Sequence, residues 1–327
     1  MLAASTASGK AKRRPEITSW GRQNTNSDRS FPNKRKTRQC GRGEVLVNRI
    51  LSKLEIEMQP GMRELDTAGI AARAGGEVLS RYFQTGVIAD HKNDVETYNL
   101  VSVADVEAEQ AIVEVIRRQF PNHAVLGEES HHDDAKSEHL WVVDPLDGTT
   151  NFVHGIPHYA VSIAYYHQGK PKCGVIFNPS RDDWYEATAG GGAFHNGKRV
   201  SVCSSETLDK VLVSVGFYYD RGEMMEATLA AVRELFHAQI HGIRRFGTAA
   251  LDLAQVGCGL FGAYFEYQLS PWDFAAGVLF VEEAGGRVTT SLGEPLPLRK
   301  TDVLATNRVL HEQVQRIVGP HLPASMR

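Results

Sequence analysis

A nine-residue stretch at 144–152, Asp-Pro-Leu-Asp-Gly-Thr-Thr-Asn-Phe, carries the residue types best suited to chemistry. Pro145 disfavours helical backbone at Asp144, so that carboxylate should end an extended segment, with Asp147 one tight turn further on. Two carboxylates this close can share a divalent cation through hard oxygen ligands. Gly148 permits close backbone approach, and the two threonines after it can open a helix whose free N–H groups suit a phosphate. The stretch predicts a metal site beside a phosphate site; the alternative is an Asp-Pro turn with a threonine helix cap.

Further acids fall at the ends of other expected elements. Asp105 lies in the first turn of a helix, where it complements the helix dipole whatever else it does. Glu128 follows a short strand, as either a solvated turn residue or a metal ligand. Asp273 stands three residues after Ser270, which predicts a capping box with Pro271 at the first helical position. Because the helix it opens is almost wholly apolar, an acid at its buried N-terminus needs a partner such as a metal.

These acids together suggest one reaction. The ends of separate elements carry several carboxylates, and no basic cluster of equal size can neutralise them: Asp105, Glu128, Asp144, Asp147 and Asp273. Two or three divalent cations would do so, and paired metals clamp a phosphoryl group and lower the pKa of a bound water. The pattern therefore predicts phosphate-ester hydrolysis. Glu266 is one acid among aromatics in an expected strand. It either joins the site or simply occupies an outward, solvent-facing position of that strand.

The elements that must position these acids alternate between helices and strands. Helical spacing predicts helices over 63–83, 102–120, 224–236, about 250–256, 271–284 and 309–318. Strands are expected at 124–126, 140–143, 160–166, 173–177, 184–188, 211–215, 263–267 and 303–306, with a loop or hairpin at 86–99. The run at 131–134, His-His-Asp-Asp, is expected to be a surface loop rather than a metal site, and the glycine triplet at 190–192 a turn.

Composition narrows the class of protein. The 327 residues hold 42% hydrophobic residues, with no apolar run long enough to span a membrane. Four scattered cysteines suggest neither a zinc site nor a disulfide framework, which favours a reducing cytoplasm. Residues 1–43 hold eleven Lys/Arg against two Asp/Glu, whereas the remainder holds 25 against 37. We expect this basic N-terminus to be disordered. Nucleic-acid binding by the acidic body is not expected; the tail alone could provide it.

Four segments resemble the motifs of the inositol monophosphatase family, within the magnesium-dependent, lithium-sensitive phosphatases. They are residues 127–130 (Gly-Glu-Glu-Ser), the stretch 144–155, residues 272–277 with 283–286, and 247–250 (Gly-Thr-Ala-Ala). The resemblance covers roughly residues 63–320. It implies a layered α/β/α/β/α sandwich, an α/β fold, with Mg²⁺ dependence and a homodimer. We expect residues 1–60 to be an extension and 61–327 the catalytic domain, with a metal-binding half at about 61–190 and a second half at 191–327.

The resemblance also implies roles for single residues. Metal ligands would be Glu128, Asp144, the carbonyl of Leu146, Asp147 and Asp273. Thr149 with Asp105 would orient the attacking water, Glu128 would share in catalysis, and the amides of Gly148 and Thr149 would hold the phosphate. Inositol hydroxyls would meet Asp147, Ala249, Glu266 and Asp273. One departure lies upstream, where Asn99 begins a segment in which the family often has Asp.

The expected function is hydrolysis of inositol monophosphate to inositol and phosphate by direct attack of metal-activated water. No activated Cys, Ser or His nucleophile is evident in the sequence. Three alternatives stay open. One is a related phosphatase acting on fructose 1,6-bisphosphate, NADP, histidinol phosphate or a nucleotide bisphosphate. The second is a two-metal nuclease, which the acidic body disfavours. The third is a regulatory protein that uses the same fold to bind RNA or protein.

Overall fold

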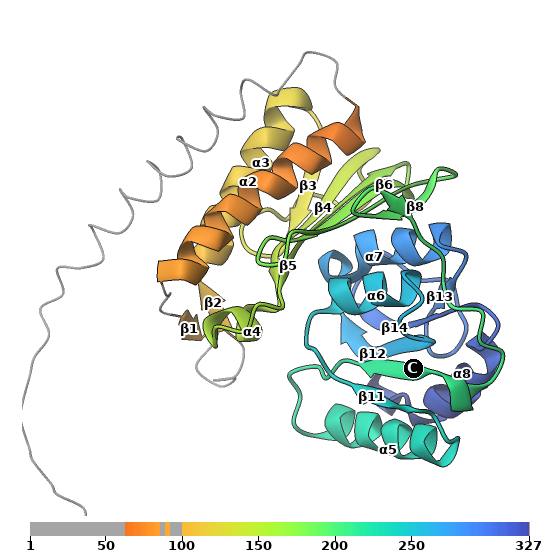
Figure 1. The fold of residues 1–327 in the computed structure, drawn as a ribbon. Coiled ribbons are helices and arrows are strands. Elements are labelled where there is room, and N and C mark those ends of the chain that lie inside the picture. The colour runs from red at the N-terminus through yellow and green to blue at the C-terminus, as the bar shows by residue number, and fades with distance from the viewer. Residues whose placement is uncertain (1–62, 86–88, 92–99, 327) are drawn as a thin grey trace, which may run out of the picture. The chain divides into compact units, whose positions relative to one another are not determined.

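A computed structural model describes residues 63–85, 89–91 and 100–326 (Figure 1). The helices are α2 (Glu64–Thr85), α3 (Val103–Gln119), α4 (Thr149–Val153), α5 (Glu223–His237), α6 (Ala249–Gly257), α7 (Pro271–Glu283) and α8 (His311–Val318), with short 3-10 turns at Leu208–Lys210, Gly319–His321 and Ala324–Met326. The strands are β1 (Ala89–His91), β2 (Leu100–Ser102), β3 (Ala124–Gly127), β4 (His139–Asp147), β5 (Ala160–His167), β6 (Lys170–Asn178), β7 (Asp183–Thr188), β8 (Gly192–His195), β9 (Lys198–Arg199), β10 (Leu212–Val215), β11 (Gly242–Arg244), β12 (Ala263–Leu269), β13 (Arg287–Thr289) and β14 (Thr301–Thr306).

The larger sheet runs in chain order from β3 to β9, with β3 parallel to β4 and every later pair antiparallel. Its central strands are buried on both faces. In β4, Trp141 and Val143 join the core on one side, while Leu140 and Val142 join the core on the other. This explains the unbroken apolar run in the sequence, because a strand covered on both faces has no outward polar positions.

The smaller sheet is mixed, with the order β11-β10-β12-β14-β13. Strand β10 lies parallel to both β11 and β12, whereas β14 is antiparallel to both of its neighbours. The carboxyl ends of β10 and β12 therefore point the same way. In open α/β sheets this is the edge at which ligands bind.

Four apolar cores separate five layers (Figure 1). Helices α2 and α3 cover one face of the larger sheet, and α6 and α7 lie between the two sheets. Helices α5 and α8 cover the far face of the smaller sheet. Helix α7 is apolar all round because it packs against both sheets, with Phe280 facing one core and Phe274 the other. The expected α/β/α/β/α sandwich is confirmed.

The expected helices and main strands are present, with shifts of a few residues at their ends. Strands β1 and β2 pair antiparallel, but only β1 falls within the expected 86–99 segment, most of which (86–88 and 92–99) lies outside the described part. The tight turn expected between Asp144 and Asp147 was wrong, because β4 continues through both. Three steps along β4 match two along β5, from Ser162 to Ala160, which is a β-bulge. Pro145 has no N–H for the ladder, and bulges accommodate such residues.

Other differences are local. Strands β11 and β13 were missed because three residues show no periodicity. The expected surface loop at 131–134 is exposed except for His131, whose Nδ1 lies 2.8 Å from the buried carboxylate of Glu109. The basic N-terminus lies outside the described residues, and the domain boundary at residue 60 stays a prediction. No described helix combines the length and apolarity required to cross a bilayer. Cys173, Cys203 and Cys258 are free thiols.

Candidate active site

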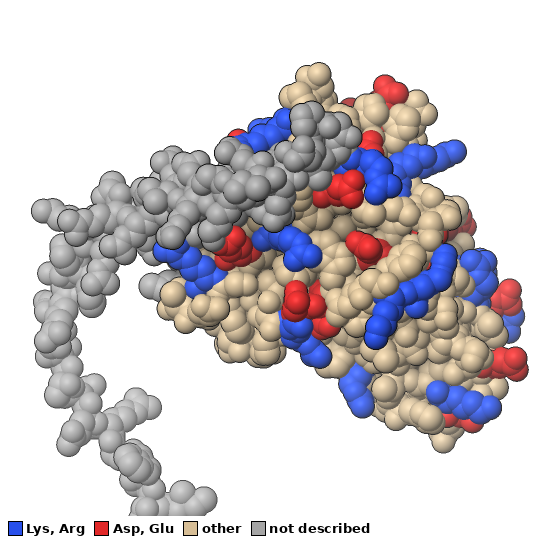
Figure 2. All heavy atoms as spheres, turned by 45° about the horizontal axis from the view of Figure 1, so that its top comes forward, with Lys and Arg blue, Asp and Glu red and all other residues tan. Residues whose placement is uncertain are grey.

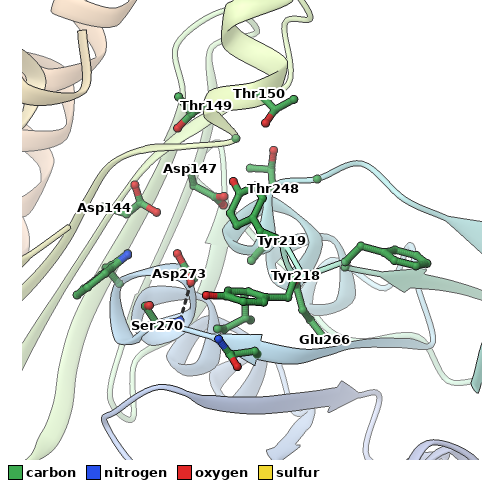
Figure 3. Close-up of a pocket in the computed structure, with 18 of the residues that line it drawn as sticks. Asp144, Asp147, Thr149, Thr150, Tyr218, Tyr219, Thr248, Glu266, Ser270 and Asp273 are labelled. Atoms are coloured by element: carbon green, nitrogen blue, oxygen red, sulfur yellow. Dashed lines mark hydrogen bonds between the residues drawn. The ribbon is translucent and has the colours of Figure 1, made fainter. Parts of the chain in front are cut away.

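One pocket of about 270 Å³ collects almost all of the residues expected to act (Figure 3). It lies where the end of β4, the start of α4 and the N-termini of α6 and α7 meet the end of β10 and strand β12. The expected residues that line it are Glu128, Asp144, Leu146, Asp147, Gly148, Thr149, Ala249, Glu266 and Asp273. Asp105 is fully buried and meets the pocket through Thr149.

The corner between β4 and α4 presents the first two carboxylates. Asp144 is 1% exposed, and its Oδ1 accepts a hydrogen bond from the backbone N–H of Leu146 at 3.0 Å. Gly148 turns the chain into α4 with a φ of 93°, a left-handed conformation that glycine adopts without strain. A β-carbon there would come within 2.6 Å of Thr248 Oγ1. The glycine in the motif is therefore needed for its backbone angle and for the close approach of a second segment.

Asp147 joins this corner to α6. Its Oδ2 accepts a hydrogen bond of 2.7 Å from the backbone N–H of Ala250, in the first turn of α6. Unpaired N–H groups at a helix N-terminus favour a negative charge, so α6 holds this carboxylate in place. Asn151 ties the same two segments together: its Nδ2 donates to the carbonyls of His158 and Phe246, each at 2.8 Å.

Helix α7 supplies Asp273 as the third carboxylate. Its Oδ2 accepts from the backbone N–H of Ser270 at 2.6 Å, the bond expected of a capping box. The residue is half-buried and lines the pocket, and Figure 3 shows Asp144, Asp147 and Asp273 converging on one space. The structural and functional interpretations of Asp273 are therefore compatible, because the cap fixes the carboxylate that faces the pocket.

Asp105 and Thr149 form a buried pair behind the carboxylates. The Thr149 hydroxyl lies 3.2 Å from Asp105 Oδ1 and 3.1 Å from the carbonyl oxygen of Leu146, so it can donate to either. Thr149 is 8% exposed and Asp105 is fully buried. Asp105 in α3 thus positions a hydroxyl at the edge of the pocket, a role that its place in the first helical turn did not reveal.

The electrostatics of the pocket call for a cation. Burial raises the pKa of Asp144 well above its usual range, and the charges of Glu128, Asp147 and Asp273 raise it further. Burial and the charge of Asp273 likewise raise the pKa of Asp147. Among the described residues lining the pocket, Arg245 is the single cationic side chain. Five carboxylates line the pocket against this one guanidinium, and the four of Glu128, Asp144, Asp147 and Asp273 offer oxygen donors that fit hard divalent cations such as Mg²⁺.

The opposite wall holds Glu266, which is 8% exposed rather than turned outward. Its Oε2 accepts a hydrogen bond of 2.8 Å from the hydroxyl of Tyr264. Burial raises the pKa of Glu266 to about 7, against the lowering effects of the Tyr264 hydroxyl and the Arg245 charge. Gly216 makes room for this carboxylate, because a β-carbon there would overlap the Glu266 side chain.

Sequence reasoning missed part of this wall. Phe217, Tyr218 and Tyr219 line the pocket directly after Gly216, and Arg245 follows β11. The available clue was position: a glycine and three aromatics follow a strand, at the edge where parallel strands place ligands. This position is not evident from the sequence, because β11 is too short to be predicted. Without β11, strand β10 has no recognisable parallel neighbour on that side.

Comparisons with known proteins agree with this geometry. Residues 62–322 match the model of the "Inositol monophosphatase family". The chain is 40% identical to "Nus factor SuhB" of Pseudomonas aeruginosa, over 83% of this chain and 100% of that protein. It is 35% identical to "Fructose-1,6-bisphosphatase/inositol-1-monophosphatase" of Aquifex aeolicus, over 80% and 97%. The solved inositol monophosphatase of Anabaena (Nostoc) sp. PCC 7120 superposes with a TM-score of 0.70 at 40% identity, over 80% of this chain and 97% of that one.

Proposed function

This chain belongs to the inositol monophosphatase family, and on that basis we propose that it hydrolyses inositol monophosphate to inositol and phosphate. The observation that carries the proposal is the convergence of four carboxylates, a buried Asp–Thr pair and a second acidic wall on one pocket. Direct attack by water suits this arrangement, since the described residues lining the pocket include no cysteine, and no histidine that could activate the hydroxyls of Ser270, Thr149 or Thr150.

Five groups would hold the two or three Mg²⁺ ions proposed for this pocket. They are the carboxylates of Glu128, Asp144, Asp147 and Asp273 and the backbone carbonyl of Leu146. The chemistry supplied by bound Mg²⁺ is activation of water and stabilisation of charge on the phosphoryl and leaving oxygens. The carboxylates are held for this task by backbone donors, as Leu146 N–H does for Asp144 and Ala250 N–H for Asp147.

The remaining residues position water and ester. We assign the Thr149 hydroxyl, which is held by Asp105, to orienting the attacking water. The carboxylate of Glu128 would also share in catalysis. The backbone N–H groups of Gly148 and Thr149 face the phosphate at the turn into α4, where partial positive charge gathers. As water oxygen bonds to phosphorus and the ester P–O bond breaks, the proton released by water passes to the departing sugar oxygen.

Specificity for the sugar would come from the opposite wall. Glu266 lines the pocket together with Ala249, Asp147 and Asp273, so all four can meet the sugar hydroxyls. As a carboxylate, Glu266 accepts hydrogen bonds from hydroxyls, which matches a polyol better than an apolar leaving group.

The proposal is tested by Mg²⁺-dependent phosphate release from inositol 1-phosphate, beside fructose 1,6-bisphosphate, NADP, histidinol phosphate and a nucleotide bisphosphate. A kcat/KM for the inositol ester well above the rest is the expected result. Preference for another ester would change the assigned substrate but keep the assigned reaction, hydrolysis of a phosphate ester. Release from none of them by the folded protein would overturn the proposal.

A second candidate function is a regulatory role through RNA or protein contacts. It is favoured by the name of the Pseudomonas aeruginosa relative, "Nus factor SuhB", and by the eleven basic residues in positions 1–43. On the face in Figure 2, basic and acidic side chains of the described residues are interspersed, so the tail is the better candidate for binding RNA. The expected result is an RNA gel shift that weakens between about 50 and 200 mM salt and disappears when residues 1–43 are deleted. Binding that survives the deletion would contradict this role for the tail.

Three further expectations remain proposals. We propose that residues 61–327 form the catalytic domain, that the protein is a homodimer, and that it is cytoplasmic. Deleting residues 1–60 should leave kcat/KM unchanged, and sedimentation should give twice the chain mass of 36.1 kDa. Loss of folding on truncation, or sedimentation as a single chain, would contradict the first two.

A further inference from the structure

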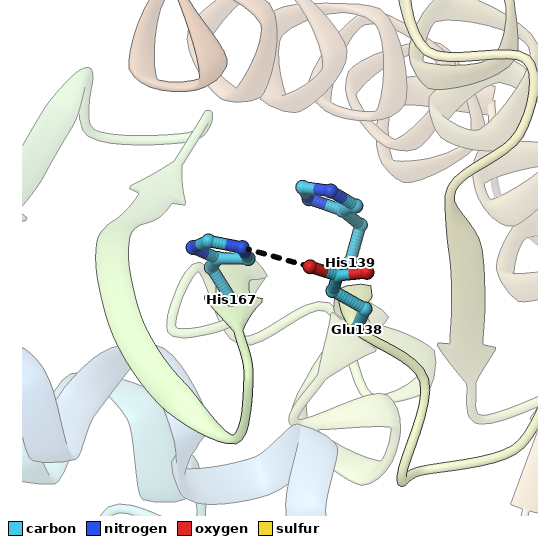
Figure 4. Close-up of side chains that lie close together, drawn as sticks. All are labelled: Glu138, His139 and His167. Atoms are coloured by element: carbon cyan, nitrogen blue, oxygen red, sulfur yellow. Dashed lines mark ion pairs between the residues drawn. The ribbon is translucent and has the colours of Figure 1, made fainter.

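Two histidines and a glutamate meet at the end of β4 remote from the catalytic pocket. His139 is the first residue of β4 and His167 the last of β5, and the two are directly paired across the antiparallel strands. Such cross-strand partners project their side chains on the same face. Glu138 precedes β4, and its carboxylate lies 3.5 Å from His167 Nε2. One ligand atom from each of the three lies within 4.8 Å of the others (Figure 4).

The cluster rests on a rigid aromatic base. The rings of His139 and His167 stack with centroids 4.7 Å apart, and His123 stacks on the other side of His139 at 4.4 Å. His123 Nδ1 accepts a hydrogen bond from Nε1–H of the buried Trp141 at 3.2 Å. The stacked His123 ring thus fixes the orientation of His139, as a preorganised metal ligand requires.

Glu138 is held from the hairpin that connects β5 to β6. The backbone N–H of Gln168 donates to the Glu138 carbonyl oxygen at 2.7 Å, and its side-chain Nε2–H donates to Glu138 Oε1 at 3.1 Å. The hairpin thus holds the carboxylate beside the His167 ring, and Oε1 is the oxygen that both Gln168 and His167 approach.

We propose that Glu138, His139 and His167 bind one divalent transition-metal cation of the zinc class. Two imidazole nitrogens and a carboxylate oxygen are a common ligand set for Zn²⁺, with water in the fourth position, and they also suit Cu²⁺ and Ni²⁺. The set differs in kind from the catalytic pocket, whose described lining includes no histidine.

Closing around an ion requires His167 to turn out of its stack on His139, because the in-plane lone pairs of two rings only 9° from parallel cannot meet at one cation. Zinc holds nitrogen and oxygen ligands at about 2.0–2.2 Å, which places tetrahedral ligand atoms roughly 3.5 Å apart. The side chains of Glu138 and His167 are 62% and 36% exposed, so His167 can leave the stack and the Glu138 carboxylate can follow it without disturbing the core.

His139 also has the outer-shell partner that metal-bound histidines usually have. Its Nδ1 lies 2.7 Å from the hydroxyl of Tyr165, a largely buried side chain. When Nδ1 carries the proton and donates it to this hydroxyl, Nε2 holds the free lone pair. Such partners fix the tautomer and orientation of a ligating ring.

The site is separate from the proposed phosphatase centre. Asp144 lies five residue steps along β4 from His139, which corresponds to roughly 17 Å. A bound ion at the histidine end would therefore link β4 to β5 without contacting the substrate. The test can use the complete, untagged chain and read the two sites independently.

The experiment is Cu²⁺ electron paramagnetic resonance at one equivalent of metal, because imidazole nitrogens split the copper signal and carboxylate oxygens do not. We expect coupling to two nitrogens in the wild type and in Asp144→Asn. His167→Gln and His139→Gln should each lose the two-nitrogen pattern. Glu138→Gln should retain it while weakening Zn²⁺ affinity by at least about tenfold in calorimetry, because losing a direct ligand should cost no less than losing a partner that orients one.

A matched control is His237→Gln, which removes an exposed histidine paired with Glu234 on α5. It should leave the two-nitrogen signal unchanged, since that pair offers only one imidazole. Circular dichroism would establish that each variant is folded. Absence of two-nitrogen coupling in the wild type, or its persistence in folded His139→Gln and His167→Gln, would overturn the proposal.

Discussion

The two ends of β4 present contrasting sites on one strand. At its carboxyl end, Asp144 and Asp147 are 1% and 9% exposed, and only oxygen ligands gather around them. At its amino end, His139 meets His167 and Glu138 at the rim of the sheet. The first set suits hard cations such as Mg²⁺, and the second suits zinc-class cations.

The contrast shows how burial sets chemistry. Buried like charges destabilise one another, so the carboxyl end is costly to the fold until a cation neutralises it. Burial and neighbouring carboxylates raise the pKa of Asp144, because both disfavour its charged form. The histidine end carries no comparable cost, because imidazoles can be neutral and stack on one another. We therefore expect the reactive centre at the carboxyl end of β4, where buried carboxylates repel one another.

The largest expected effect comes from Asp144→Asn. Removing one ligand charge from the pocket should lower kcat by about 10³-fold or more, since transition-state charge is no longer compensated. His167→Gln, at the other end of the strand, should keep full turnover. Phosphate release under saturating Mg²⁺ compares the two. Near-normal turnover by Asp144→Asn would contradict the assignment of catalysis to the carboxyl end of β4.

A glycine at each end offers the next comparison. Gly148 and Gly169 both have positive φ, 93° and 70°, so alanine strains the backbone at either position. A β-carbon at Gly148 also meets Thr248, whereas nothing lies within 4 Å at Gly169. Gly148→Ala should therefore displace the catalytic corner and lower kcat by about 10²-fold. Gly169→Ala should cost about 1 kcal/mol of folding free energy and leave kcat unchanged. Equal effects on kcat would contradict this account.

Glu266 gives a smaller, pH-dependent effect. Its pKa of about 7 means that it loses its charge, and a hydrogen-bond acceptor site, as the pH falls below that value. KM for the inositol ester should rise by roughly tenfold between pH 8 and about 6, and Glu266→Gln should have high KM at every pH. Tyr264→Phe removes a hydrogen bond that lowers this pKa, so the inflection should move to higher pH. An unchanged inflection would exclude Glu266 as its source.

Stability without metal should show the weakest effect. Because the folded-state pKa values of Asp144 and Asp147 are raised, the folded chain keeps protons that the unfolded chain releases above pH about 4. Stability in chelator should therefore fall as the pH rises, by a few °C in Tm, and saturating Mg²⁺ should reverse the fall. Asp144→Asn should flatten this slope and His167→Gln should not. Calorimetry from pH 5 to 8 measures both.

The sequence was most informative where chemistry and local structure coincide. Asp144, Asp147 and Gly148 are close along the chain, and Ser270 with Asp273 is a local capping pattern, so both groups could be placed on elements. The layered fold was implied by the resemblance of the motifs to a family, and the family match and the solved relatives confirm it.

What could not be predicted depends on contacts between distant segments. The pairing of His139 with His167 requires the register of a hairpin, which single-sequence periodicity does not fix. Gly216 matters only because Glu266, fifty residues later, fills the space beside it. His131 was expected in solvent because its neighbours are polar, yet it contacts the buried Glu109 across the fold.

The most direct test of the catalytic centre is anomalous diffraction from crystals soaked in Mn²⁺ at a concentration that supports turnover. Mn²⁺ takes the same oxygen ligands as Mg²⁺ and scatters anomalously. We expect at least two peaks among Glu128, Asp144, Asp147 and Asp273, and their loss in Asp144→Asn. An empty carboxylate pocket in crystals of active enzyme would contradict it.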